Sequence, residues 1–221
     1  MKPNLENHSV VFLSQQIKPT DFKPDALQRT EVLREKDGWM LSDPLVFLPH
    51  FTRITLENGV VIDVTHGKLM INAPVVKNLL ESPAVTIAHR FLEIHKELLI
   101  TAVGINFSSI FFNTEPEQII KRIMQLRNSP LMEEGRLETT AVLYSRKDDH
   151  SKLNFKVEVS YLKEINKETG VESEAKLAIN VSSNFHYDCT PEGLFEKSID
   201  CLSNLVDNWK EHSRLIKLMR I

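Results

Sequence analysis

Hydrophobic and polar positions alternate along several stretches of the chain with the two-residue period of a strand that has one wet face. Residues 51–73 show this best, because this segment contains three alternating runs separated by two turns. The runs are FTRITLE, VVIDVT and KLMINA, and the turns lie at Asn58-Gly59 and at Gly67. An Asn-Gly pair tolerates the positive φ of a type I′ turn, so this segment predicts a three-strand meander. Similar runs predict further strands over 8–14, 98–112, 137–145, 153–164 and 176–187.

A period of three to four residues indicates amphipathic helices. Helices are predicted over 25–34, 82–96, 114–127 and 190–219, while the proline-interrupted segment 37–50 is expected to be an irregular connection. Ser82 is expected to cap the second of these helices. The last helix is the longest, and its apolar positions recur along one side at Phe195, Ile199, Leu202, Val206 and Trp209.

The order of these elements predicts an α+β fold, mainly an antiparallel sheet with amphipathic helices on one face and a long C-terminal helix. We expect a single domain over 1–221. Two related halves are also expected, 51–112 and 137–219, each a meander with a helix, with the strand at 98–112 joining them.

Composition excludes several classes of protein. The net charge is −3 and the basic residues are scattered, so the basic surface of a nucleic-acid-binding protein is not expected. No apolar run approaches the roughly 18 to 20 residues that cross a membrane. With only two cysteines, Cys189 and Cys201, a disulfide framework is excluded, and a cytoplasmic protein is predicted.

The densest group of reactive side chains is His186-Tyr-Asp-Cys189, where a predicted strand ends and the last helix begins. A cysteine near a helix start has a lowered pKa, and His186 offers a base, which together suggest a thiol nucleophile. The simpler interpretation is ordinary helix entry. The remaining histidines do not form metal-binding spacings, so neither a metal site nor a cofactor is predicted. His212 is expected to be a hydrogen-bonded core histidine.

A second candidate is the aromatic segment around Ile105, Phe107, Phe111 and Phe112. One hypothesis makes it a sheet edge that accepts a partner strand, because edge strands present unpaired amides and carbonyls. The other makes it a central strand whose phenylalanines pack under the helices. Gly104 indicates either a bulge or a close approach of the backbone there.

Four segments carry a resemblance to known proteins: SVVFLSQQI at 9–17, the NGVVIDV hairpin, TAVGINF at 101–107 and NFHYD at 184–188. Together they resemble a family of bacterial conserved hypothetical proteins without an established activity, and the resemblance implies no catalytic residues. The arrangement of antiparallel strands backed by a long C-terminal helix is also similar to SecB-like chaperone folds and to helix-grip ligand carriers.

Three functions remain open from the sequence. The first is a non-enzymatic cytosolic protein that binds another polypeptide, including a second copy of itself. The second is a small-molecule carrier with an apolar pocket between the sheet and the C-terminal helix, beneath Phe195 to Trp209. The third is a thiol-dependent enzyme that uses Cys189.

Overall fold

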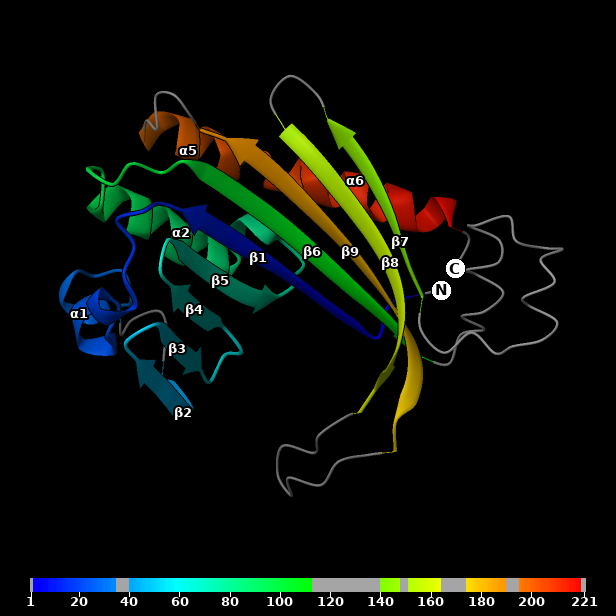
Figure 1. Ribbon diagram of the computed structural model, residues 1–221, viewed down its shortest axis with the longest axis horizontal. Coiled ribbons are helices and arrows are strands. Elements are labelled where there is room, and N and C mark those ends of the chain that lie inside the picture. The colour runs from blue at the N-terminus through cyan, green and yellow to red at the C-terminus, as the bar shows by residue number, and fades with distance from the viewer. Residues whose placement is uncertain are drawn as a thin grey trace, which may run out of the picture.

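The computed structural model describes residues 2–34, 40–112, 140–147, 151–163, 174–189 and 195–219. Within these ranges, nine strands form one antiparallel sheet with the order β2-β3-β4-β5-β1-β6-β9-β8-β7 (Figure 1). The strands are β1 (Leu5–Leu13), β2 (Leu41–Leu48), β3 (Phe51–Leu56), β4 (Val61–Thr65), β5 (Lys68–Pro74), β6 (Ala102–Phe112), β7 (Thr140–Lys147), β8 (Ser151–Leu162) and β9 (Lys176–Asp188).

Helices cover one face of this sheet. Figure 1 shows α2 (Pro83–Ile94) along the first half of the sheet and α5 (Phe195–Ser203) followed by α6 (Leu205–Leu218) along the second half. The short α1 (Pro24–Arg29) and two 3₁₀ turns, η1 (Pro19–Asp21) and η3 (Leu79–Glu81), complete the described helical elements. The predicted α+β architecture is therefore confirmed, while the helix expected over 114–127 lies outside the described residues.

Two halves of equivalent topology meet at the β1/β6 pair. In the first half β1 pairs with β5, which continues to β4 and β3. In the second half β6 pairs with β9, which continues to β8 and β7. The meander of each half is followed by helix on the same face of the sheet. The strand predicted at 98–112 is found as β6, and its pairing with β9 groups it with the meander of the second half.

The core lies between the sheet and its helices. Along β9 every second side chain is buried, among them Val181, Phe185 and Tyr187, and the residues between them are half-buried. The same alternation runs along β5, β6 and β8. The helix-covered face is thus mainly apolar, and the opposite face, which we call the open face, carries most of the polar positions of the pattern.

The C-terminal helix is interrupted once among its described residues. The predicted helix over 190–219 divides at Asn204 into α5 and α6. Ser203 Oγ donates to the carbonyl of Asp200 at 2.6 Å, and Asn204 Nδ2 donates to the same oxygen at 3.2 Å. These side chains compete with backbone amides for the carbonyl, which weakens the helix locally. Both parts still pack on the sheet through residues such as Leu202 and Leu205.

Local details differ from the sequence expectations at three places. In the Asn58-Gly59 turn only Gly59 has a positive φ, +85°, and its amide donates to Leu56, so the turn is not type I′. Residues 41–48 form the edge strand β2 with an irregularity between Ser42 and Val46, where an irregular connection was expected. Ser82 does not cap α2 with its side chain.

Candidate functional site

A line of neutral polar side chains crosses the middle of the open face. Strand register places Asn72, Ser9, Asn106, Asn184 and Asn154 opposite one another on five neighbouring strands, β5, β1, β6, β9 and β8. We call these five residues the polar row. Each alternates along its strand with side chains buried on the helix side, so all five belong to the open face. The row therefore spans both halves of the sheet.

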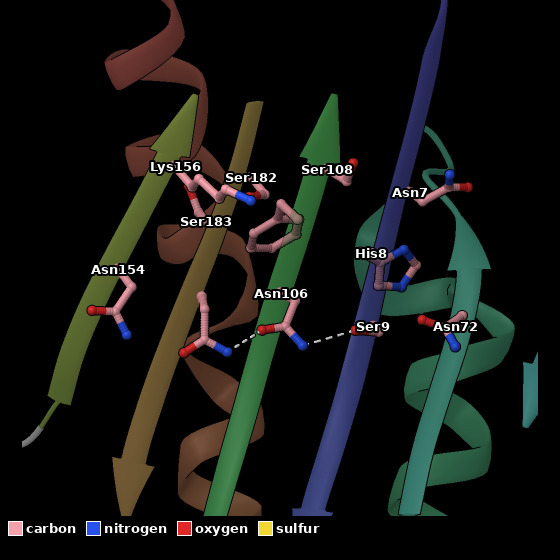
Figure 2. Close-up of a pocket in the computed structure, with 12 residues that line it drawn as sticks. Asn7, His8, Ser9, Asn72, Asn106, Ser108, Asn154, Lys156, Ser182 and Ser183 are labelled. Carbon is pink, nitrogen blue, oxygen red and sulfur yellow. Dashed lines mark hydrogen bonds between the residues drawn. The ribbon is translucent and has the colours of Figure 1, made fainter. Parts of the chain in front are cut away.

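Hydrogen bonds fix the centre of the polar row. Asn106 Nδ2 donates to Ser9 Oγ at 2.9 Å, and Asn184 Nδ2 donates to Asn106 Oδ1. Figure 2 shows this chain of bonds running from β9 over β6 to β1. Because the Asn106 carboxamide uses both its oxygen and its nitrogen, its orientation is set before any ligand arrives. At the far end Ser145 Oγ donates to Asn154 Oδ1 at 3.0 Å.

The polar row lies in an open depression of about 350 Å³. Asn7, Ser108, Ser182 and Lys156 extend its lining on the open face (Figure 2). Among the described lining residues, Lys156 is the one that carries a charge, and its Nζ lies 2.8 Å from the Glu158 carboxylate, next along that face of β8. The depression is thus concave, nearly neutral in charge, and rich in amide and hydroxyl groups.

One glycine beside the polar row allows close packing of the strands. A Cβ on Gly104 would lie 3.3 Å from the Cβ of Val11 and 3.9 Å from the Asn184 amide nitrogen. Gly104 pairs regularly with Val11 and with His186 on its two neighbouring strands. The close-approach interpretation of this glycine is confirmed, and the bulge is not found.

Aromatic side chains behind the row hold the strands in register. Asn106, Asn154 and Asn184 are each followed by a buried phenylalanine on the helix side: Phe107, Phe155 and Phe185. The rings of Phe107 and Phe185 meet edge to face at 6.2 Å between centroids. A slip of one residue would move these rings to the open face, so the core that fixes the rings also fixes the asparagines.

Two buried histidines flank Phe107. His212 of α6 has its Nε2 3.0 Å from Ser109 Oγ and its Nδ1 2.7 Å from Ser183 Oγ, and its ring stacks on Phe107 at 5.6 Å. The prediction of a hydrogen-bonded core histidine at His212 is confirmed. Burial lowers its pKa to about 4, so the imidazole is neutral near pH 7.

His8 occupies the other side of Phe107. Its Nε2 lies 2.8 Å from the hydroxyl of Ser82, which explains why that serine does not cap α2. Burial also lowers the pKa of His8 to about 4. Both histidines therefore act as neutral hydrogen-bonding groups under the helices.

The structure does not bring Cys189 and His186 together as nucleophile and base. His186 lies between the buried side chains of Phe185 and Tyr187 and so points to the open face. Cys189 is fully buried among core residues on the helix side. Its sulfur contacts Ser198 Oγ at 4.0 Å. The alternation of the strand separates the two groups.

The edge-strand hypothesis for the aromatic segment is wrong, because β6 pairs with β1 on one side and β9 on the other. Ile105, Phe107 and Phe111 are buried in the core at 0 to 1% exposure, and Phe112 is half-buried at the end of the strand. The alternative hypothesis of a central strand is confirmed.

Side chains fill the space beneath the C-terminal helices near Phe107. The ring of Trp209 lies 5.2 Å from Phe107 and 5.4 Å from His212, measured between centroids. Leu202 and Leu205 are buried in the same cluster. The depression described above lies on the opposite face of the sheet from the apolar pocket that the carrier hypothesis expects.

Sequence reasoning missed the polar row, although a signal was present. One three-residue pattern, a hydrophobic or small residue followed by asparagine and phenylalanine, occurs three times. It is Ile-Asn-Phe at 105–107, Leu-Asn-Phe at 153–155 and Ser-Asn-Phe at 183–185. Asparagine is depleted in strands, so its repeated use at open-face positions is informative. The signal becomes a site only when the register aligns the strands.

Other classes of site are not found among the described residues. Within those ranges, no three His, Cys, Asp or Glu side chains gather as metal ligands. No described helix is both long enough and apolar enough to cross a membrane. The sequence matches no protein-family model, and a comparison with curated proteins finds no relative.

Proposed function

We propose that this protein is a non-enzymatic binding module that holds an extended, uncharged stretch of polypeptide on its open sheet face. The observation that carries the proposal is the polar row, with its pre-oriented carboxamides. A carboxamide offers a donor and an acceptor side by side, as a peptide group does. The row is thus chemically matched to polypeptide backbone rather than to any particular side chain.

Charge supports a neutral partner. Lys156, the charged residue of the described lining, is paired with Glu158, so this part of the site has no surplus cation for a polyanion. Nucleic-acid sites depend on several lysines or arginines that contact phosphates. The residues lining the depression include no such cluster.

The placement of the aromatic side chains on the helix side of the sheet argues against a sugar as the partner. Phe107, Phe155 and Phe185 lie on the helix side of the sheet. The lining also includes two rings, His8 and Phe107, but each is only 1% exposed. The other described lining residues are asparagines, serines and one lysine, so the described lining offers no exposed ring on which the apolar face of a sugar can stack.

The length of the row suits a short extended segment. Its five members span four interstrand gaps, and at about 4.8 Å per gap the row is about 19 Å long, which matches about six residues of extended chain.

The similarity of the architecture to SecB-like chaperone folds also favours a polypeptide partner. Two unpaired cysteines support a reducing compartment such as the cytoplasm.

Binding is tested with a fluorescein-labelled peptide of about ten uncharged residues rich in Val, Thr and Ser, a composition that favours extended structure. Fluorescence anisotropy measures its dissociation constant with the intact chain. Replacing Asn106 or Asn184 by alanine removes a backbone-matching group, so each variant is expected to bind about threefold to tenfold more weakly.

Two controls separate backbone recognition from general stickiness. The same peptide with N-methylated amides lacks the backbone donors and is expected not to bind. Lys210→Ala changes an exposed residue of α6 and is expected to bind like the original chain. Equal affinity for both peptides, or binding unaffected by the asparagine substitutions in folded variants, contradicts the proposal.

A further inference from the structure

Three asparagines of the polar row lie on alternate strands of the sheet. Asn72 is on β5, Asn106 on β6 and Asn154 on β8, with β1 and β9 between them. Because neighbouring strands are about 4.8 Å apart, these three carboxamides repeat about every 9.6 Å along the row. A chain that contacts all three must have a backbone repeat that matches this distance.

Each of these three carboxamides is oriented by a neighbouring group. Asn72 Nδ2 donates to the carbonyl oxygen of Val61 at 3.5 Å, and Asn154 Oδ1 accepts from Ser145. Asn106 is bonded to the two remaining members of the row. A carboxamide nitrogen carries two hydrogens and its oxygen two lone pairs. After these bonds, each of the three still has a donor and an acceptor for a ligand.

We infer that the bound segment adopts the polyproline II conformation, with every third residue in contact with one of the three asparagines. This inference rests on the peptide-binding function proposed above and names the class of segment that the same site holds. A polyproline II chain has three residues per turn and rises about 3.1 Å per residue, so equivalent residues repeat about every 9.3 Å. Over two repeats the chain and the row differ by only about 0.6 Å.

A β-strand laid along the row does not match it. Equivalent residues of a strand repeat about every 6.7 Å, which is out of step with the asparagines. The side chains of a strand also stand above and below its backbone, while its amides and carbonyls point sideways. A strand lying flat on the row would therefore present side chains to the carboxamides. A polyproline II chain has no internal hydrogen bonds, so its backbone groups are available at every turn.

Recognition through the backbone sets a rule for the sequence of the segment. Aromatic grooves bind polyproline II segments by packing rings against prolines, but the two rings of the described lining, His8 and Phe107, are each 1% exposed. Residues in contact with the asparagines need an amide N–H and so cannot be proline. Proline between the contacts favours binding, because it fixes φ at about −65° and keeps the preceding residue extended.

Two labelled peptides of about ten uncharged residues test the preferred conformation. One has proline at every third position, with Ser, Ala and Gln between the prolines. The other is the Val, Thr and Ser peptide described above. The proline peptide loses less conformational freedom on binding. Fluorescence anisotropy with the intact chain is expected to show that it binds at least about threefold more tightly.

The bound conformation is measured on the isotope-labelled Val, Thr and Ser peptide, whose composition favours a strand. The NMR coupling between each amide proton and its α-proton reports φ. We expect the small coupling of a φ of about −75° and not the large coupling of a φ of about −140°. A bound φ in the strand range overturns the inference and leaves peptide binding itself intact.

Asn72→Ala and Asn154→Ala test the repeat. Each removes a contact at one end of the row, so each is expected to bind the proline peptide about threefold to tenfold more weakly. Asn204→Ala, at an exposed asparagine between α5 and α6, is the matched control and is expected to bind like the original chain. Only variants that fold by circular dichroism are compared, and the bound φ decides where a variant does not fold.

The outcomes separate this inference from the proposed function. Equal affinity for the two peptides, or unchanged affinity in both end variants, overturns the polyproline II conformation while peptide binding stands. Failure of both peptides to bind the intact chain overturns the two together.

Discussion

Asn106 and Ser9 face each other across the β6/β1 pair, and the Asn106 amide donates to the Ser9 hydroxyl at 2.9 Å. This pair stands where the two halves of the sheet meet. On either side of it, Asn72 and Asn184 occupy equivalent strands, β5 and β9, the last strand of each meander. The polar row is therefore centred on the junction of the halves, and a ligand on it contacts both.

Substitution of Asn106 by alanine is expected to destabilise the fold modestly. It removes the bond to Ser9 and the bond accepted from Asn184, and each bond is worth about 0.5–1.5 kcal/mol net. Because Asn106 is only half-buried, water replaces part of the loss, and a total of about 1 to 2 kcal/mol is expected from urea unfolding. Ser108→Ala, on the same strand and face, loses one bond to Asn180 and should cost less. A cost for Asn106→Ala no larger than that of Ser108→Ala contradicts this prediction.

The elements of the fold followed from local patterns, whereas the site did not. Alternation along 51–73 and the proline after Ser82 placed strands and a helix where β3, β4, β5 and α2 are found. The polar row depends on register between strands far apart in sequence, such as Ser9 with Asn106. A pattern read along one strand contains no information about which residue lies opposite it.

The same limit explains the errors about single residues. Ser82 has the sequence context of a helix cap, but the buried His8 supplies a competing partner from a distant strand. The sequence left the segment around Phe107 open between an edge strand and a central strand, and only its neighbours β1 and β9 decide between them. His212 was predicted correctly because its position on the apolar side of a helix is a local property.

Replacing His212 by phenylalanine is expected to destabilise the protein although an aromatic ring remains at this position. The hydroxyl of Ser183 would lose its partner in a buried place, and a buried unsatisfied polar group costs about 1–3 kcal/mol. Guanidinium unfolding of His212→Phe, Ser183→Ala and the double variant measures this. The double variant should be more stable than the sum of the two losses predicts, and strict additivity would argue against the coupling.

Stability is expected to fall as the solution is acidified from pH 6.5 towards pH 4. Burial lowers the pKa of both His8 and His212 to about 4 from 6.5. In this window the unfolded chain binds more protons than the folded one, so unfolding becomes more favourable as pH falls. The loss is at most about 3 kcal/mol per histidine. The loss disappears about one to two pH units above 6.5, where the histidines of the unfolded chain are neutral as well.

Urea unfolding at several pH values, repeated with His8→Gln, checks this acid sensitivity. The variant should show a shallower dependence on pH, while His66→Gln, at an exposed turn, should match the original chain. Burial raises the pKa of Glu6, which acts in the opposite direction, so the slopes of variants are compared rather than the total change. An unchanged slope in His8→Gln rules out this histidine as a source.

The ion pair between Arg53 and Asp63 is expected to respond unequally to removal of its two partners. Arg53 Nε and Nη2 donate to the two oxygens of Asp63 at 2.6 and 2.7 Å across the β3/β4 pair. The Asp63 side chain is 11% exposed and that of Arg53 is 47% exposed. Arg53→Ala leaves a buried carboxylate without its cation and should cost about 2 to 4 kcal/mol. Asp63→Asn leaves a solvated guanidinium and a neutral amide and should cost about 1 kcal/mol.

Lys210→Ala, which breaks an exposed pair with Asp207, serves as the control and should cost less than about 0.5 kcal/mol. Thermal unfolding at neutral pH ranks the stability losses of the three variants. Equal losses for Arg53→Ala and Asp63→Asn would show that burial of the carboxylate does not determine how much this ion pair stabilises the fold.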